Sequence, residues 1–271
     1  MDLQPAYADE RLTAELADGI CHLGLNDPEH MNSWSTTMST GLRDAVTAAL
    51  GDGCRRFVVY GHGDNFSAGA DLSEREQYEA IGGGEGFHDF YAAERALIDV
   101  ARLFHQPDVL AVAACHGWVI GQALEVIMAC DFVVAEPGTT FWLPETRWGW
   151  NVGMGATYLL AHTLGVGWTK RMLLLGDQLP VETAHQLGLV ARVGELGPRR
   201  ELATGLIAEV ERGAPRAWQS VKKLIDILPS TSLEDSRELE LVNAYWLAHT
   251  KDVVEGVTAW EEKRPPDYRG V

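Results

Sequence analysis

The sequence lacks closely spaced cysteines. It contains only four, and they are far apart in the chain: Cys21, Cys54, Cys115 and Cys130. Zinc sites and redox motifs need cysteines a few residues apart, so neither kind of site is predicted and no bound metal is expected. Single cysteines in apolar segments are usually buried, and we expect all four to be reduced core residues.

Positive charge is also scarce. The chain has 22 Lys and Arg residues against 39 Asp and Glu residues, which gives a formal net charge of −17. Nucleic-acid binding depends largely on Lys and Arg side chains that neutralise phosphates. A nucleic-acid partner is therefore not expected.

No long uninterrupted hydrophobic run occurs. The longest apolar stretch, residues 109–135, is interrupted by His116, Gln122, Glu125 and Asp131. This pattern is typical of a buried core and argues against a membrane-spanning segment. The first ten residues contain no basic stretch followed by an apolar one, so no secretion signal is predicted and we expect a cytoplasmic protein.

What the chain does contain is an alternation of strand and helix signals. Its 271 residues are 46% hydrophobic, enough for a core that buries roughly three quarters of the unfolded surface. Strand-like apolar runs alternate with segments of helical periodicity, which predicts an α/β core. The strand-like runs are 20–25, 56–60, 109–114 and 132–135, and the helical ones are 38–50 (capped by Ser35 or Thr36), 122–130 and 154–164.

Beyond Gly197–Pro198 the pattern changes to helix alone. The segments with helical periodicity and no strand signal are 200–212, 215–228 and 233–263. We therefore expect two regions, a core over residues 1–197 that carries the active site and a C-terminal helical region over 198–271. The glycine-rich segment 81–86 is interpreted as a loop, hypothetically a lid.

Two glutamates stand inside otherwise apolar segments. Glu125 lies between Leu124 and Val126, and Glu145 follows Leu143–Pro144. Burying an unpaired charge costs several kcal/mol or forces protonation, so two such groups indicate chemistry. A structural explanation stays open for each, because Glu125 could pair with an arginine and Glu145 could cap a helix.

Six short segments carry a resemblance to a known family. They are Leu25–Asn32, Asn65–Asp71, His116–Asp131, Phe141–Glu145, Gly188–Val190 and Glu255–Pro266. Each alone is a weak signal, but the six in this order resemble the crotonase superfamily, the enoyl-CoA hydratase/isomerase family. The resemblance runs nearly from end to end of the chain.

This resemblance implies a fold and an assembly. The family fold is a spiral of ββα units, followed by a helical region that builds a homotrimer or a dimer of trimers. The implied substrate is an acyl-CoA, with coenzyme A as part of the thioester, and the implied reactions are typical of fatty acid metabolism. No separate cofactor, metal or redox group is required by this chemistry.

The resemblance also implies an active site. The backbone N–H groups that match Ala70 and Gln122 form the family's oxyanion hole for a thioester enolate. Glu125 and Glu145, separated by 145 − 125 = 20 positions, match the two acid–base glutamates of the hydratases. The implied enzyme therefore adds water reversibly to the double bond of a 2-enoyl-CoA thioester.

Further residues are candidates for substrate binding. Small residues near the oxyanion positions would let a ligand approach the backbone, and a tryptophan there could hold a bulky or aromatic acyl group. A basic residue near the C-terminus could meet CoA phosphates, whereas a lone histidine more often has a structural role. The candidates are Ala68, Asp71, Gly121, His116, Trp142 and Lys263.

Several positions depart from the family pattern. Gln122 and Ala123 replace family glycines, so Gln122 puts a side chain at the start of the helix. Trp142 replaces a residue that is usually small. Where the family often carries Lys or Arg for the CoA phosphates, His30 is the one possible cation in Glu29–Met31.

Other functions are compatible with the same family. An enolate-stabilising site could also support isomerisation, decarboxylation, or CoA-independent hydrolysis of a carbon–carbon bond in a diketone, and the fold alone does not choose between them. A further alternative is a non-catalytic subunit that serves in assembly. Retention of both Glu125 and Glu145 favours hydration, because isomerisation needs one proton shuttle whereas hydration must also handle water.

Overall fold

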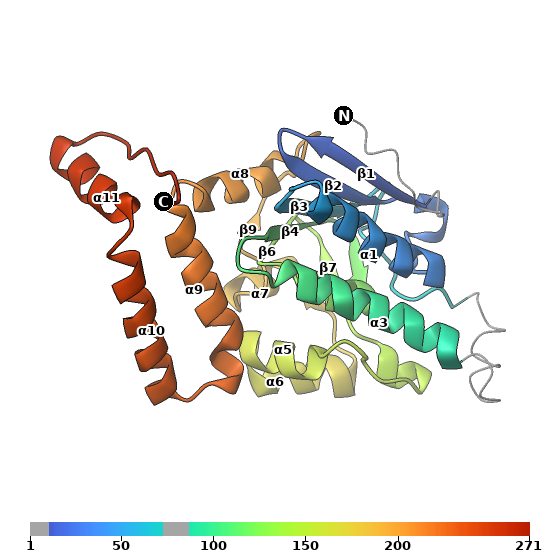
Figure 1. Ribbon diagram of the computed structural model, residues 1–271. Coiled ribbons are helices and arrows are strands. Elements are labelled where there is room, and N and C mark those ends of the chain that lie inside the picture. The colour runs from blue at the N-terminus through green and yellow to red at the C-terminus, as the bar shows by residue number, and fades with distance from the viewer. Residues whose placement is uncertain (1–10, 73–86) are drawn as a thin grey trace. The chain divides into compact units, whose positions relative to one another are not determined.

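The computed structural model describes residues 11–72 and 87–271, with side chains from residue 91 onward in the second range. Residues 12–193 contain a six-stranded sheet in the order β1-β2-β3-β4-β6-β9 (Figure 1). β1 and β2 pair antiparallel and the other neighbours pair in parallel. All six residues of β4 are buried, as expected of a strand covered on both faces. The strands are β1 (Leu12–Ala17), β2 (Ile20–Leu25), β3 (Arg56–Gly61), β4 (Leu110–Cys115), β6 (Phe132–Ala135) and β9 (Arg192–Val193).

A second, smaller sheet has the order β5-β7-β8. The chain supplies the two sheets alternately, because β4 enters the first and β5 the second, and β6 and β7 repeat this pattern. A helix follows each pair of strands, α4 after β5 and α5 after β7. This is the ββα repeat of a crotonase-like fold. The bounds are β5 (Trp118–Ile120), β7 (Thr140–Trp142), β8 (Leu179–Pro180), α4 (Gln122–Ile127) and α5 (Ala156–Thr163).

Two isolated bridges extend the second sheet. Ser67 pairs in parallel with Val119 of β5, and Ala70 pairs in parallel with Trp34. The segment that contains Ser67 and Ala70 therefore runs alongside β5 in the same direction. This pairing places the segment Asn65–Asp71 beside the segment His116–Asp131.

Helices pack around the two sheets. α1 (Thr36–Gly51) packs against α3 (Phe87–Phe104), and the two lie side by side in Figure 1. Ser35 caps α1, since its Oγ accepts a hydrogen bond from the N–H of Met38 at 3.1 Å, which confirms one of the two predicted caps. Shorter helical elements are α6 (Gly165–Lys170), α7 (Val181–Gln186), 3₁₀ turns at Pro28–His30, Glu145–Trp148 and Leu228–Ser230, and a π-helical turn at Arg171–Leu175.

The chain divides into two compact units. One comprises residues up to 204 without 105–108, and the other comprises 105–108 and 205–271. The division falls inside α8 (Glu201–Val210), seven residues (204 − 197) after the predicted end of the core.

The second unit is helical. It contains α9, α10 and α11 in addition to the end of α8. The helical periodicity over 233–263 corresponds to two helices, which are separated at 248–250, where Thr250 adopts extended backbone (φ −80°, ψ 151°) ahead of α11. The bounds are α9 (Pro215–Ile227), α10 (Leu233–Leu247) and α11 (Lys251–Glu262).

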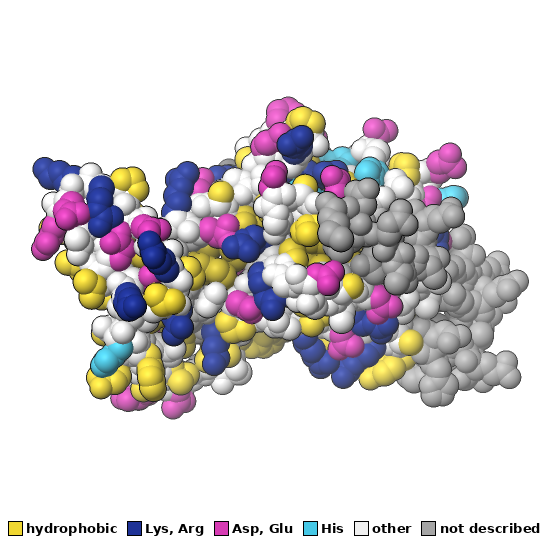
Figure 2. All heavy atoms as spheres, turned by 45° about the horizontal axis from the view of Figure 1, so that its top comes forward, with side chains coloured by type: hydrophobic (Ala, Val, Ile, Leu, Met, Phe, Trp, Pro, Cys, Tyr) yellow, Lys and Arg dark blue, Asp and Glu magenta, His cyan; other side chains and the backbone are white. Residues whose placement is uncertain are grey.

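Large apolar side chains are exposed on α10 and α11. Figure 2 shows hydrophobic side chains at the surface of this unit, among charges of both signs. The exposed side chains include Leu241, Tyr245, Trp246, Val254, Val257 and Trp260.

The cysteines lie in or against the core, as predicted. Cys21, Cys54 and Cys115 are buried, Cys130 is half-buried, and all four are free thiols. Burial raises the pKa of Cys21 to about 12, so its thiol stays protonated near neutral pH. Within the described ranges, no group of three or more His, Cys, Asp or Glu side chains could hold a metal ion, and no helix is long and apolar enough to cross a membrane.

The segment 81–86, interpreted from the sequence as a loop and hypothetical lid, lies outside the described residues.

Asn32 anchors the backbone that leads to the bridged segment. It is fully buried, and its Nδ2 lies 2.7 Å from the carbonyl oxygen of His62, 2.8 Å from that of Asn65 and 3.2 Å from that of Phe66. Its Oδ1 accepts a hydrogen bond from the N–H of Asp27 at 2.8 Å. Buried carbonyls without donors are costly, so the path of this segment depends on one amide side chain.

We expect Asn32→Ala to lower the free energy of unfolding by about 2 to 4 kcal/mol, because several buried backbone groups lose their partner at once. Asn26→Ala is the matched control, since none of the described residues hydrogen-bonds to that side chain, and its effect should stay within about 0.5 kcal/mol. Urea unfolding followed by circular dichroism measures both changes. Equal midpoints for the two variants would contradict the anchoring role of Asn32.

Candidate active site

Two backbone N–H groups meet where residues 67–70 run alongside β5. The bridge between Ser67 and Val119 sets the register, so three residues further along Ala70 comes level with Gln122, the first residue of α4. Among the described residues, neither N–H has a hydrogen-bond acceptor. Both residues are half-buried, so a ligand atom could reach these two donors.

Two glycines with positive φ make this approach possible. Gly69 has φ +83°, and a Cβ there would lie 2.6 Å from the carbonyl oxygen of Ile120 and 3.5 Å from the nitrogen of Gln122. Gly121 has φ +56° and precedes α4. Any side chain at Gly69 would push the two segments apart, so the donor pair requires glycine at this position.

Glu145 lies directly against Gly121. It follows β7 at the start of a 3₁₀ turn, and a Cβ on Gly121 would lie 2.9 Å from Glu145 Oε1. Glu145 Oε2 is buried and has no hydrogen-bond partner among the described residues. Burial, and next the negative charge of Glu125, raise the pKa of Glu145 to about 7. Near neutral pH this carboxyl group can therefore hold or release a proton.

Glu125 is held differently. It stands in the first turn of α4 with 5% of its surface exposed. The backbone N–H of Met154 donates to Oε1 at 2.8 Å, and that of Gly153 donates to Oε2 at 3.4 Å. Burial raises the pKa of Glu125, while these amide hydrogen bonds favour the charged form and oppose the rise. The partners of Glu125 are thus backbone amides rather than an arginine.

A third carboxyl group, Glu94, belongs to this site, and the sequence analysis did not identify it. Glu94 lies on α3, and its Oε1 accepts a hydrogen bond from Nε2 of Gln122 at 2.9 Å. Burial raises the pKa of Glu94 to about 7, helped by the charge of Glu125. The sequence feature that could have indicated Glu94 is a single carboxylate next to the buried residues Ala93 and Leu97 of the same helix.

The two predicted aromatic candidates have backbone partners. Trp142 donates from Nε1 to the carbonyl oxygen of Gly176 at 2.9 Å, and its ring centroid lies 6.4 Å from that of Trp118. His116 Nε2 lies 2.9 Å from the carbonyl oxygen of Gly63. Contact of Trp142 or His116 with a substrate stays a prediction.

The remaining candidates are spread over both units. The N–H of Ala68 donates to the carbonyl oxygen of Met31 at 2.9 Å, and Asp71 lies 4.0 Å from Arg11. Lys263 belongs to the second unit, where it is exposed and ends α11 with φ +56°. Substrate binding by these residues also stays a prediction.

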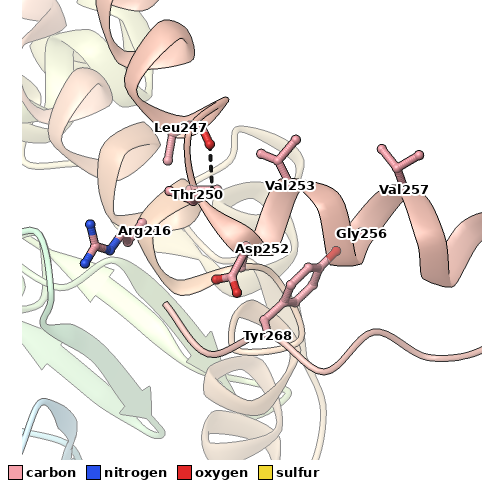
Figure 3. A pocket seen from close by; sticks show the side chains of 10 residues that line it. Arg216, Leu247, Thr250, Asp252, Val253, Gly256, Val257 and Tyr268 are labelled. Atoms are coloured by element: carbon pink, nitrogen blue, oxygen red, sulfur yellow. Dashed lines mark hydrogen bonds between the residues drawn. The ribbon is translucent and has the colours of Figure 1, made fainter. Parts of the chain in front are cut away.

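One cavity in the second unit has different chemistry from the site of the first unit. It measures about 300 Å³ and is lined by residues of α9, α11 and the C-terminal segment (Figure 3). Its carboxylate, Asp252, accepts hydrogen bonds from the N–H groups of Arg269 at 2.9 Å and Gly270 at 2.8 Å. Because both oxygens are used to hold the end of the chain, this cavity offers no acid–base pair.

Comparison with known proteins identifies the family of the chain. The family model described as enoyl-CoA hydratase/isomerase matches residues 15–271. The chain belongs to the enoyl-CoA hydratase/isomerase family. The match covers both structural units.

Individual relatives are similar over nearly their whole length. The chain is 30% identical to the 2,3-dehydroadipyl-CoA hydratase of Escherichia coli over 92% of this chain and 94% of the relative. It is 28% identical to the crotonyl-CoA hydratase of Syntrophomonas wolfei over 96% and 98%. Among solved structures, an enoyl-CoA hydratase from Bacillus anthracis has a TM-score of 0.84 at 26% identity, covering 97% of this chain and all of that one. These comparisons establish an enzyme of the crotonase fold.

The raised pKa of Glu145 has a consequence for stability. The folded protein holds this proton more tightly than the unfolded chain, so stability is present at low pH and is lost as pH rises from 4.5 through about 7. Between pH 5 and pH 8 we expect the free energy of unfolding of the parent to fall further than that of Glu145→Gln, by about 1 to 3 kcal/mol.

Urea unfolding of the parent and Glu145→Gln at the two pH values measures the difference. Glu182→Gln, at an exposed position of α7, is the matched control and should follow the parent. Parallel pH dependence of the parent and Glu145→Gln would show that burial does not perturb the carboxyl group.

Proposed function

We propose that this protein catalyses the reversible syn addition of water to the double bond of a 2-enoyl-CoA thioester. The observation that carries the proposal is the pairing of two carboxyl groups in unlike environments, the buried Glu125 and the half-buried Glu145, with the two unbonded N–H groups of Ala70 and Gln122. Family membership supports hydration as the reaction class.

In the proposed complex, the thioester oxygen accepts hydrogen bonds from the N–H groups of Ala70 and Gln122. These donors oppose the negative charge that develops on the oxygen when a nucleophile adds to the β carbon. Because they belong to the backbone, they need no reorganisation, and one such donor contributes about 3 kcal/mol to transition-state stabilisation. The pair would favour the enolate-like state over the substrate.

The two glutamates have complementary tasks. Glu125, whose charged form is favoured by the N–H groups of Met154 and Gly153, takes a proton from water as the water oxygen bonds to the β carbon. Glu145, whose pKa of about 7 leaves a protonated fraction near neutral pH, gives its proton to the α carbon. The charge of Glu125 supports this division because it raises the pKa of Glu145.

The substrate class follows from the relatives. The E. coli and S. wolfei relatives are named as hydratases of acyl-CoA substrates, and an acyl-CoA is the partner that we propose here. Hydration consumes only water besides the thioester, so the reaction requires no separate cofactor. The proposed binding residues are Ala68, Asp71, Gly121, His116, Trp142 and Lys263.

We further propose that the helical unit forms a homotrimer or a dimer of trimers, as the family resemblance implies. The exposed apolar side chains of α10 and α11 support this, because monomers rarely expose many large apolar groups together. Sedimentation equilibrium gives the assembled mass.

We expect Glu125→Gln and Glu145→Gln each to lower kcat by about 10² to 10⁴-fold, since each removes a proton-transfer group. Loss of enoyl-thioester absorbance on a panel of short, long and aryl 2-enoyl-CoAs measures the rate. Glu182→Gln is the matched surface control and should turn over like the parent.

Absence of turnover by the folded parent on every thioester would exclude hydration and direct the search to diketone substrates or a non-catalytic role. Full activity in either glutamate variant would contradict the assigned chemistry even if the parent is a hydratase.

A further inference from the structure

Glu94 is a half-buried acid that the proposed reaction does not use. One of its oxygens is fixed, because Oε1 accepts the hydrogen bond from Gln122 Nε2 at 2.9 Å. The other, Oε2, is buried and has no hydrogen-bond partner among the described residues. A buried carboxyl oxygen without a partner is costly when the group is charged, so its retention needs an explanation.

Glu94 and Glu125 flank the same glycine. A Cβ on Gly153 would lie 2.8 Å from Glu94 Oε2, and the N–H of Gly153 donates to Glu125 Oε2 at 3.4 Å. The two carboxyl groups are therefore separated by one residue without a side chain. At such short range two negative charges repel each other strongly in a buried site.

The cations near α3 are engaged elsewhere. Among the described charged groups, only Glu125 affects the pKa of Glu94, and it raises this pKa by repulsion. On α3 itself Arg102 pairs with Asp99 at 3.0 Å, and Arg95 lies 3.9 Å from the same carboxylate. On α1, which packs against α3, Arg43 pairs with Asp44 at 2.7 Å. Among the described residues no cation compensates the charge of Glu94.

The link to the oxyanion position runs through Gln122. Its backbone N–H is one of the two proposed donors, and its side chain is directed to Glu94. Gln122 puts an amide at a helix start where the family has glycine, and an untethered amide there could fold over the donor. The hydrogen bond to Glu94 holds the amide in one place, which keeps the backbone N–H open to a ligand.

We propose that Glu94 is a positioning residue that holds the side chain of Gln122 away from the oxyanion position, and that it is coupled to Glu125 by charge repulsion across Gly153. Its effect on catalysis rests on the proposed hydration. The coupling between Glu94 and Glu125 exists whatever reaction the site performs, so the two can be tested separately.

The sign of the effect is fixed by repulsion. When both groups are charged, each disfavours the charged form of the other, and burial together with the charge of Glu125 raises the pKa of Glu94 to about 7. Glu94→Gln removes the charge and keeps a side chain that can hydrogen-bond to Gln122. In that variant the repulsion that arises at pH 8 is absent while the side chain of Gln122 stays tethered. Glu94→Ala removes both the charge and the hydrogen bond.

A double-mutant cycle tests the coupling without using the reaction. Urea midpoints are measured for the parent, Glu94→Gln, Glu125→Gln and the double variant at pH 5 and pH 8. At pH 8 each single change relieves the same repulsion, so the shift of the double variant should be smaller than the sum of the single shifts. At pH 5 Glu94 is protonated and the shifts should add.

A control cycle between Glu94→Gln and Glu182→Gln, which is exposed on α7, should be additive at both pH values. Additivity of Glu94 and Glu125 at pH 8 would overturn the proposal. This result stands even if the protein hydrates no thioester, so failure of the coupling is distinguishable from failure of the proposed function.

The rate of hydration gives the second readout. Glu94→Gln should retain kcat, because its side chain can still hydrogen-bond to Gln122. Glu94→Ala should lower kcat, since Gln122 loses its anchor. Rescue by the conservative variant separates positioning of Gln122 from a merely structural role, and an equal loss of kcat in both variants, or no loss in Glu94→Ala, would overturn the proposal.

Discussion

The active site depends on the parallel pairing of residues 67–70 with β5. The Ser67–Val119 bridge brings the N–H groups of Ala70 and Gln122 level with each other, and Gly69 allows the close approach. Asn32 holds the incoming backbone through its buried side chain. Helix α4 begins at this point, so the same constraint that aligns the donors also places Glu125.

Burial of several carboxyl groups is the second constraint. Glu94, Glu125 and Glu145 are buried or half-buried, and the partners recorded for them among the described residues are amides rather than cations. Such groups cannot all be charged near neutral pH without a large cost. The site resolves this by giving Glu125 two amide donors and leaving Glu145 Oε2 without one. Unlike environments for like groups are what acid–base catalysis requires.

The features that could be predicted from the sequence are those with a local sequence pattern. Glu125 and Glu145 were identifiable because a charge inside an apolar run is unusual, and the Ser35 cap because a hydroxyl precedes a helical pattern. The α/β alternation was likewise readable, and the motif order indicated the family. Glu94 was not identified, since one acidic residue on an amphipathic helix resembles a solvated position until tertiary packing buries it. Strands of three residues, such as β5 and β7, and the helix break at 248–250 carry too few residues for periodicity to show.

The donor pair can be tested directly by binding acetoacetyl-CoA to the parent protein. The enolate of this 3-ketoacyl thioester absorbs in the near ultraviolet, where its keto form does not. If the N–H groups of Ala70 and Gln122 stabilise an oxyanion, the bound thioester should absorb as the enolate at a pH about two units or more below that needed in solution. Tight binding without enolate absorbance, or no binding at all, would contradict an oxyanion hole for acyl-CoA thioesters at this position.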